Sequence, residues 1–173
     1  MVWPIVRWPV RSRGPPGPVA LSFVLAFLGP DWVQALDDAA SASAVLAQRT
    51  ADLDLVVEQH VSAVPGVPGG EVSYHVSFDH GAVSVRPGPA AAPTVRFSQD
   101  LDTAIAIAAG SSSAQRAFMT GRLRVGGDLT VLLAHGDVLA ELDDVFAPVR
   151  ERTELPAAAA PPSAAAALGA TDA

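Results

Sequence analysis

The sequence predicts an α+β fold, in which a five-stranded antiparallel sheet is covered on one face by helices. Five short segments alternate apolar and polar residues with a period of two, as strands do when one sheet face is buried and the other is wet. Other segments repeat apolar residues at the 3.6-residue spacing of amphipathic helices. Because a sheet with one apolar face needs a cover, we expect the helices to pack on that face.

The predicted strands share one pattern, apolar on one face and polar on the other. In the first strand the apolar set is Leu53, Leu55, Val57 and Val61, opposed by polar residues such as Glu58. A turn at His80 and Gly81 follows the second strand. The strands are expected at residues 53–62, 71–79, 83–86, 94–97 and 122–125.

Helices are predicted before, between and after these strands. Asp31 begins the first helix, and Trp32 lies on its apolar face. Ser98 is expected to cap a helix that ends at Gly110, and Pro148 is expected to stop the last helix. The helical segments are 31–48, 99–109, a short turn at 115–119, a segment that begins at residue 129, and 137–146.

Composition excludes several kinds of chemistry. The 173 residues include no cysteine, which excludes disulfides, thiolate catalysis and cysteine metal sites. All eleven basic residues are arginine, which excludes a lysine Schiff base. The net charge is −7, and a chain this acidic is a poor binder of nucleic acid because phosphate contacts need a positive surface. No cofactor is expected.

The sequence predicts one domain with a tail at each end. The domain is assigned to residues 24–154; the Pro/Arg-rich extension 1–23 and the Ala/Pro-rich tail 155–173 are expected to be disordered. The apolar run 19–28 superficially resembles a secretory signal, but it leads directly into the first predicted helix. It is also too short to span a bilayer. We therefore expect a cytoplasmic monomer or weak dimer without stable membrane insertion.

Clusters of titratable residues have simpler interpretations than catalysis. His60 and His75 could be cross-strand zinc ligands, but their place on the polar strand face favours ordinary exposed histidines. Asp100 and Asp102 could act as acid and base, but their place in the first turn of a predicted helix favours stabilisation of the helix dipole. Asp143 and Asp144 could do the same, but they are expected on the solvent-exposed face of a helix.

Four arginines are predicted to project from the outer sheet face, namely Arg86, Arg96, Arg122 and Arg124. Acidic residues that include Glu58 and Glu71 point the same way, so cross-strand ion pairs are the preferred interpretation. A patch that recognises phosphate groups is the alternative.

The segment 113–129 has the most specific pattern: a helical turn, a glycine, a short alternating strand, a Gly-Gly break and an Asp-started helix. Its informative residues are Gln115, Ala117, Phe118, Gly121, Leu123, Val125, Gly127 and Asp128. This segment resembles the sterol carrier protein type 2 family, and the resemblance extends over roughly residues 27–154. Members of that family are lipid-binding domains with an apolar cavity between sheet and helices.

The resemblance implies non-catalytic binding or transfer of a fatty acid, a fatty acyl-CoA, a sterol or a similar lipid. The lipid-binding residues that it implies are Phe97, Ile105, Ala108, Gln115, Phe118, Met119, Leu132, Leu133, Val138, Leu142, Val145 and Phe146. Two alternatives stay open. A small enzyme or accessory subunit for hydrophobic metabolites would gain support if Arg116 or His135 lined an internal polar pocket; the other alternative is a protein-interaction module.

Overall fold

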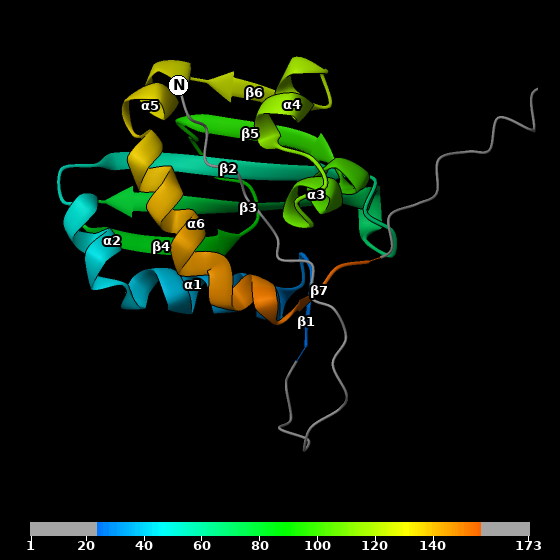
Figure 1. Ribbon diagram of the computed structural model, residues 1–173, viewed down its shortest axis with the longest axis horizontal. Coiled ribbons are helices and arrows are strands. Elements are labelled where there is room, and N and C mark those ends of the chain that lie inside the picture. Colours follow the sequence, from blue (N-terminus) through cyan, green and yellow to red (C-terminus); the bar gives the residue numbers. More distant parts are fainter. Residues whose placement is uncertain (1–23, 157–173) are drawn as a thin grey trace, which may run out of the picture.

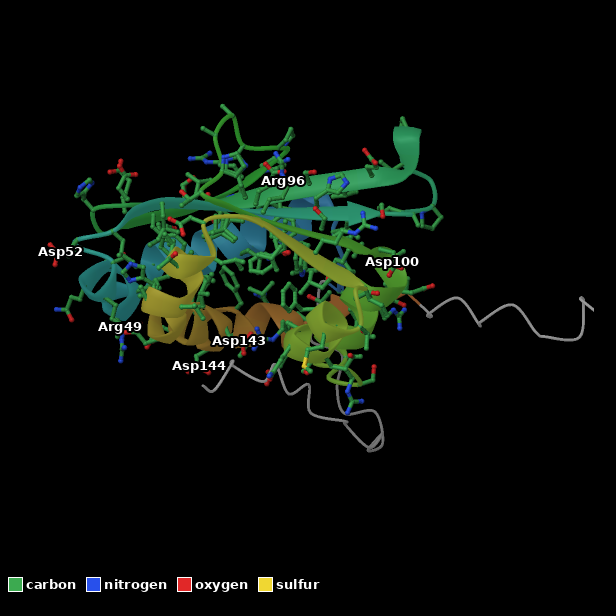
Figure 2. All side chains as sticks on the ribbon, turned by 90° about the horizontal axis from the view of Figure 1, so that it is seen from above. Arg49, Asp52, Arg96, Asp100, Asp143 and Asp144 are labelled. Carbon is green, nitrogen blue, oxygen red and sulfur yellow. The ribbon has the colours of Figure 1, made fainter. Side chains whose placement is uncertain are left out.

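The computed structural model describes residues 24–156, so the predicted extension and nearly all of the predicted tail lie outside the described residues. The main sheet has five strands in the order β4-β3-β2-β5-β6. Figure 1 shows the last helix, α6 (Gly136–Glu151), crossing in front of β2, β3 and β4, and Figure 2 shows the α-helices gathered on one side of the sheet. The strands are β2 (Asp54–Ser62), β3 (Glu71–Asp79), β4 (Ala82–Pro87), β5 (Val95–Asp100) and β6 (Leu123–Gly127). The predicted α+β class, with a one-sided helical cover, is confirmed.

The sheet is mixed, and the prediction of a purely antiparallel sheet is wrong. β2, β3 and β4 form an antiparallel meander, but β5 pairs in parallel with β2. The parallel pairing arises because the chain leaves β4 at one edge and returns beside β2 through the crossover loop 88–94. β5 and β6 are again antiparallel.

The crossover loop lies against the outer face of the sheet. The Gly88 backbone N–H donates to the Ser73 carbonyl at 2.7 Å, and the Ala90 N–H donates to Glu58 Oε2 at 2.9 Å. Glu58 is consequently buried, although the alternation had placed it on the wet face. The loop therefore covers the middle of a face that would otherwise be open to water.

The helices differ from the prediction at their ends. The expected helix 31–48 is divided into α1 (Pro30–Ala42) and α2 (Ala44–Arg49), because the Ser43 side chain accepts a hydrogen bond from the Leu46 N–H and starts a new helix. Asp100 rather than Ser98 caps the next helix. The remaining helices are η1 (Pro68–Gly70), α3 (Leu101–Ala108), α4 (Ala114–Met119), α5 (Leu129–Ala134) and α6 (Gly136–Glu151).

The last helix continues beyond Pro148, so the expectation that this proline stops it is wrong. Pro148 lies in the final turn of α6, where its missing N–H removes a single intrahelical bond and the helix runs on to Glu151. The chain then forms β7 (Thr153–Glu154), which pairs in parallel with β1 (Leu25–Ala26). The sequence pattern did not predict this small second sheet, which joins the two ends of the described domain.

The core lies between the helices and the inner face of the sheet. Phe78, Val85 and Val95 are buried from the sheet side, and Leu36 and Leu46 are buried from the helices. α1 also protects the edge of the sheet, since Asp37 Oδ1 accepts a hydrogen bond from the Val85 N–H of edge strand β4. At the other end of the inner face, toward α3 and β7, the packing leaves a cavity.

Candidate functional site

A cavity of about 270 Å³ lies between the inner sheet face and helices α1, α3 and α6. This volume is close to the lower end of the range of roughly 300–1,000 Å³ that is usual for small-molecule sites. Most of the wall is apolar. The lining residues that the sheet provides are Val57, Gln59, Val61, Tyr74, Val76, Phe97, Gln99 and Leu123. Those from helices and connecting segments include Phe27, Trp32, Leu36, Ala104, Ile107, Ala108, Leu139, Leu142 and Phe146.

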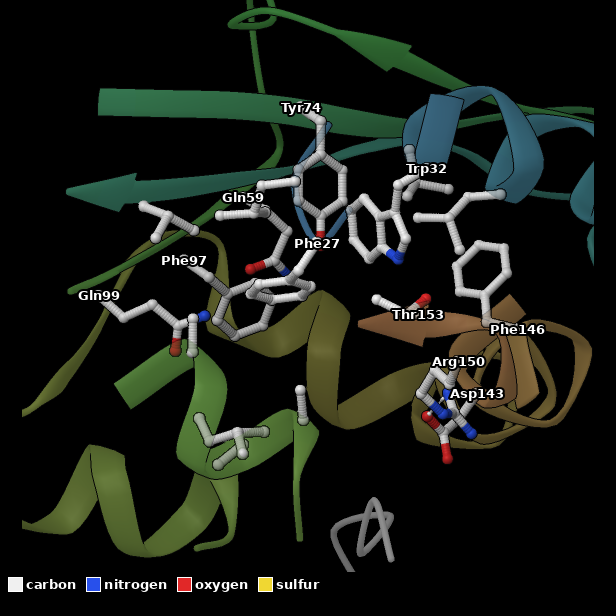
Figure 3. Close-up of a pocket in the computed structure, with 18 of the residues that line it drawn as sticks. Phe27, Trp32, Gln59, Tyr74, Phe97, Gln99, Asp143, Phe146, Arg150 and Thr153 are labelled. Carbon is white, nitrogen blue, oxygen red and sulfur yellow. Dashed lines mark hydrogen bonds and ion pairs between the residues drawn. The ribbon is translucent and has the colours of Figure 1, made fainter. Parts of the chain in front are cut away.

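Aromatic side chains form one wall of the cavity. Phe27 and Trp32 meet edge to face with ring centroids 5.2 Å apart, and Trp32 and Tyr74 do the same at 5.3 Å. Figure 3 shows the three rings together at the cavity. Edge-to-face pairs fix the relative orientation of aromatic rings, so this wall is preformed.

A small number of polar groups interrupt the apolar wall. Gln59 and Gln99 point into the cavity from β2 and β5 (Figure 3). Gln99 Oε1 and Trp32 Nε1 are buried and have no hydrogen-bond partner among the described protein atoms. Burial raises the pKa of the Tyr74 hydroxyl well above its usual range, so this group stays neutral. Such polar groups in an apolar cavity can orient a bound molecule.

The charged part of the cavity wall is an ion pair on α6. Arg150 Nη1 donates to Asp143 Oδ1 at 2.5 Å, and both side chains are about four-fifths buried. Burial raises the pKa of Asp143, while the Arg150 guanidinium opposes that shift. The two charges cancel, so the pair adds no net charge to the cavity.

Comparison with known proteins identifies the family. The model of the SCP-2 sterol transfer family matches residues 33–140, which is more than half of the chain. The chain belongs to the SCP-2 sterol transfer family. A search of curated proteins found no significant match to this SCP-2 chain.

Solved structures share the fold of this SCP-2 chain. One is a conserved hypothetical protein of Thermus thermophilus, described as a possible sterol carrier protein; it has a TM-score of 0.57 at 20% identity, with 77% of this chain and 94% of that chain covered. Another is a crystal structure of sterol carrier protein 2, with a TM-score of 0.55 at 21% identity and with 72% and 98% covered. At these identities the likeness establishes the SCP-2 fold.

The structure brings part of the predicted lipid-binding set together at the cavity, namely Phe97, Ala108, Leu142 and Phe146. Ile105 is buried in α3 outside the cavity lining, and Val145 is half-buried in α6. Val138 lines a much smaller adjoining void together with His135. The exposed members of the set are Gln115, Phe118, Met119 and Leu133. The side chain of Leu132 lies outside the described residues.

Several lining residues of the SCP-2 cavity were missed. Gln59 interrupts the apolar face of its predicted strand, and this break in the alternation was the signal that could have revealed it. Gln99 was assigned to a helix, whereas β5 continues to Asp100 and places Gln99 on the inner sheet face. Asp143 faces the cavity, so its assignment to the wet side of a helix is wrong, whereas Asp144 is exposed as predicted. Arg150 and Thr153 gave no signal, since they follow the proline at which the helix was expected to end.

The histidines and Arg96, which were considered for other chemistry, lie away from the main cavity. β2 and β3 pair His60 with Ser73 and His75 with Glu58, so the two histidines are not opposite each other. Arg96 forms the cross-strand ion pair that was preferred for the outer face. Arg116 is exposed, and His135 borders the small void, so neither residue lines the main cavity. Within residues 24–156, no helix is long and apolar enough to cross a membrane.

Proposed function

We propose that this SCP-2 domain binds a hydrophobic ligand, of the class of fatty acids, fatty acyl-CoA, sterols and similar lipids, and carries or transfers it unchanged. The observation that supports this function is the preformed apolar cavity between the sheet and α6. Cavities of this kind suit ligands that are mostly hydrocarbon and make few polar contacts. Relatives with the same fold carry sterol carrier names, which agrees with the proposal.

The chemistry of the wall supports carriage rather than conversion. Among the described lining residues the acid is Asp143, which is already paired with Arg150, and the Thr153 hydroxyl donates to the Val149 carbonyl. A nucleophile held beside a general base is the usual arrangement for covalent catalysis, and this part of the chain presents none at the cavity. The cavity therefore suits a binding role.

Ligand extraction tests the proposal directly. The purified full-length chain is extracted with organic solvent, and mass spectrometry is expected to find co-purified lipid. The delipidated chain should then take up N-phenyl-1-naphthylamine, a neutral dye that fluoresces in apolar cavities. A chain that holds no lipid and takes up no dye would contradict the proposal.

A cavity-blocking variant locates the binding. Ala108 lines the cavity, so Ala108→Phe should lower dye affinity by about tenfold or more by filling the space. Ala44 is exposed on α2, and Ala44→Phe is the matched control that should bind the dye as the parent chain does. Circular dichroism checks that both variants fold. Equal binding by the two variants would place the ligand elsewhere.

A further inference from the structure

Two glutamines lie next to each other on a face that is otherwise apolar. In the parallel pairing of β2 and β5, Gln59 is opposite Phe97 and Val61 is opposite Gln99. Gln99 follows Phe97 by two residues on β5, so it is a diagonal neighbour of Gln59. Both glutamine side chains lie on the inner face of the sheet. Figure 3 shows both amides directed into the cavity. We call Gln59 and Gln99 the amide pair.

The amide pair has unused hydrogen-bonding capacity. Gln99 Oε1 is buried without a hydrogen-bond partner among the described protein atoms, and the half-buried side chain of Gln59 lines the same cavity. A buried amide is costly to leave unpaired, so its presence on this face indicates a partner that enters the cavity. Each amide offers both a donor and an acceptor. A hydroxyl group, which also donates and accepts, matches the pair whichever way each amide is turned.

The charge of the wall selects against an ionised ligand. Arg150 is the cation among the described lining residues, and Asp143 neutralises it. The other polar groups that face the cavity are uncharged, and they include the Tyr74 hydroxyl, which burial keeps neutral. A carboxylate that entered this cavity would carry an uncompensated charge into an apolar surrounding, which is strongly unfavourable.

We propose that the amide pair binds an uncharged hydroxyl group, so that the ligand of this chain is a lipid alcohol rather than a free fatty acid. The inference rests on the proposed function, because it concerns the ligand of the same cavity. The hydrocarbon part of the ligand lies against the aromatic wall of Phe27, Trp32 and Tyr74, and its hydroxyl lies at Gln59 and Gln99 on the sheet.

Displacement of N-phenyl-1-naphthylamine from the delipidated full-length chain tests the amide pair. The competitors are 1-dodecanol and 1-chlorododecane, which share a chain length and differ in the hydroxyl. Gln99→Leu should weaken 1-dodecanol about fivefold, the loss of one hydrogen bond, and leave 1-chlorododecane unchanged or tighter. Gln48 is exposed on α2 and lies outside the cavity lining, so Gln48→Leu is the matched control and should change neither.

Dodecanoate at mildly alkaline pH, where its carboxylate is ionised, tests how the charge of the cavity wall affects binding. The parent chain should bind 1-dodecanol more tightly than dodecanoate. Asp143→Asn removes the neutralising partner of Arg150, so dodecanoate should gain about tenfold while 1-dodecanol stays within about twofold. Asp144→Asn, which changes the neighbouring exposed carboxylate, should alter neither affinity.

The outcomes separate this inference from the proposed function. If 1-chlorododecane displaces the dye but Gln99→Leu leaves 1-dodecanol binding unchanged, the amide pair does not bind the hydroxyl, and the lipid-binding function stands. If the parent chain prefers dodecanoate, the ligand is not restricted to alcohols, and the inference falls alone. If none of the three competitors displaces the dye, the proposed function and the inference both fail.

Discussion

Glu58 and Arg96 face each other across the parallel strands β2 and β5 and form an ion pair beneath the crossover loop. Arg96 Nε donates to Glu58 Oε1 at 2.7 Å, and Ala90 of the loop donates to the other carboxylate oxygen at 2.9 Å. Glu58 is 2% exposed, whereas the Arg96 side chain is half exposed. The carboxylate therefore holds three segments together: β2, β5 and the loop that connects β4 to β5.

Replacement of Glu58 should destabilise the fold. Glu58→Gln keeps the shape of the side chain but removes the charge that Arg96 and the Ala90 N–H contact, so the free energy of unfolding should fall by about 1–3 kcal/mol. Urea denaturation measures the change. Glu71→Gln is the control, because Glu71 is an exposed acid 3.7 Å from His60 and should contribute less than about 1 kcal/mol. Equal losses would show that burial of Glu58 is unimportant.

Gly127 should be intolerant of a side chain, while its neighbour Gly126 should accept one. Gly127 has φ +90°, and a Cβ atom built on it would lie 2.2 Å from the Thr94 carbonyl oxygen. Gly126 lacks a positive φ, and a Cβ there would meet no atom within 4 Å. Gly127→Ala should cost at least about 2 kcal/mol of unfolding free energy, and Gly126→Ala less than about 1 kcal/mol. Thermal and urea unfolding of the two variants compare their stabilities directly. A larger loss for Gly126→Ala than for Gly127→Ala would contradict the close approach of Gly127 to the Thr94 carbonyl.

The strands could be predicted from the sequence because a sheet with one buried face requires apolar and polar residues to alternate along each strand. The same alternation is present in parallel and antiparallel strands, so Val95 and Phe97 on β5 gave no sign of their direction. Direction depends on the path of the crossover loop, which is fixed by contacts between distant residues such as Glu58 and Ala90. The helix break at Ser43 was similarly hidden, since alanine-rich sequence on both sides favours a continuous helix.

The cavity was predictable only in part for a related reason. Phe97 and Leu142 belong to apolar stripes, and stripes identify residues that face the core without distinguishing a filled core from a hollow one. The residues around the 113–129 motif that were expected at the cavity are exposed in α4, where Phe118 is 47% and Met119 77% exposed. Ala108 lines the cavity and these residues do not, because the tertiary arrangement decides where each helix lies relative to the cavity. The spacing of apolar residues along one helix does not report that position.

The cap of α3 should make stability depend on pH. Burial raises the pKa of the Asp100 carboxyl, but two other effects lower it by more. They are hydrogen bonding from Thr103, whose N–H donates to Oδ1 at 2.7 Å, and the positive charge of Arg122. The pKa of Asp100 therefore lies below its usual range. A group with a depressed folded pKa contributes stability above its unfolded pKa of about 4, and this contribution is lost as pH falls through the folded value.

Asp100→Asn isolates this effect, because asparagine also caps helices but does not titrate. The parent chain should be more stable than the variant at neutral pH, and the difference should shrink as the pH falls below about 4. Urea midpoints measured across this range test the expectation, with Asp31→Asn as the control at an exposed acid in the first turn of α1, whose N-cap residue is Gly29. A difference that is constant with pH would mean that the Asp100 charge has no role in the cap.

Arg49 should control the opening of α6. Its Nε lies 3.2 Å from Glu141 Oε2 and its Nη1 lies 3.7 Å from Asp137 Oδ2, so α2 is tied to the first half of the helix that carries Leu139 and Leu142 to the cavity. Because these pairs are partly exposed, Arg49→Ala should lower global stability by less than about 1 kcal/mol. Amide hydrogen exchange in the first half of α6 should become about two- to fivefold faster, because the variant lacks both ion pairs that oppose local opening of the helix.

Arg116→Ala is the control: its guanidinium forms no ion pair within residues 24–156, and exchange in α6 should be unchanged. If α6 exchanges equally fast in the parent chain and in Arg49→Ala, its position depends on apolar packing against α1 and the sheet, not on the ion pairs to α2.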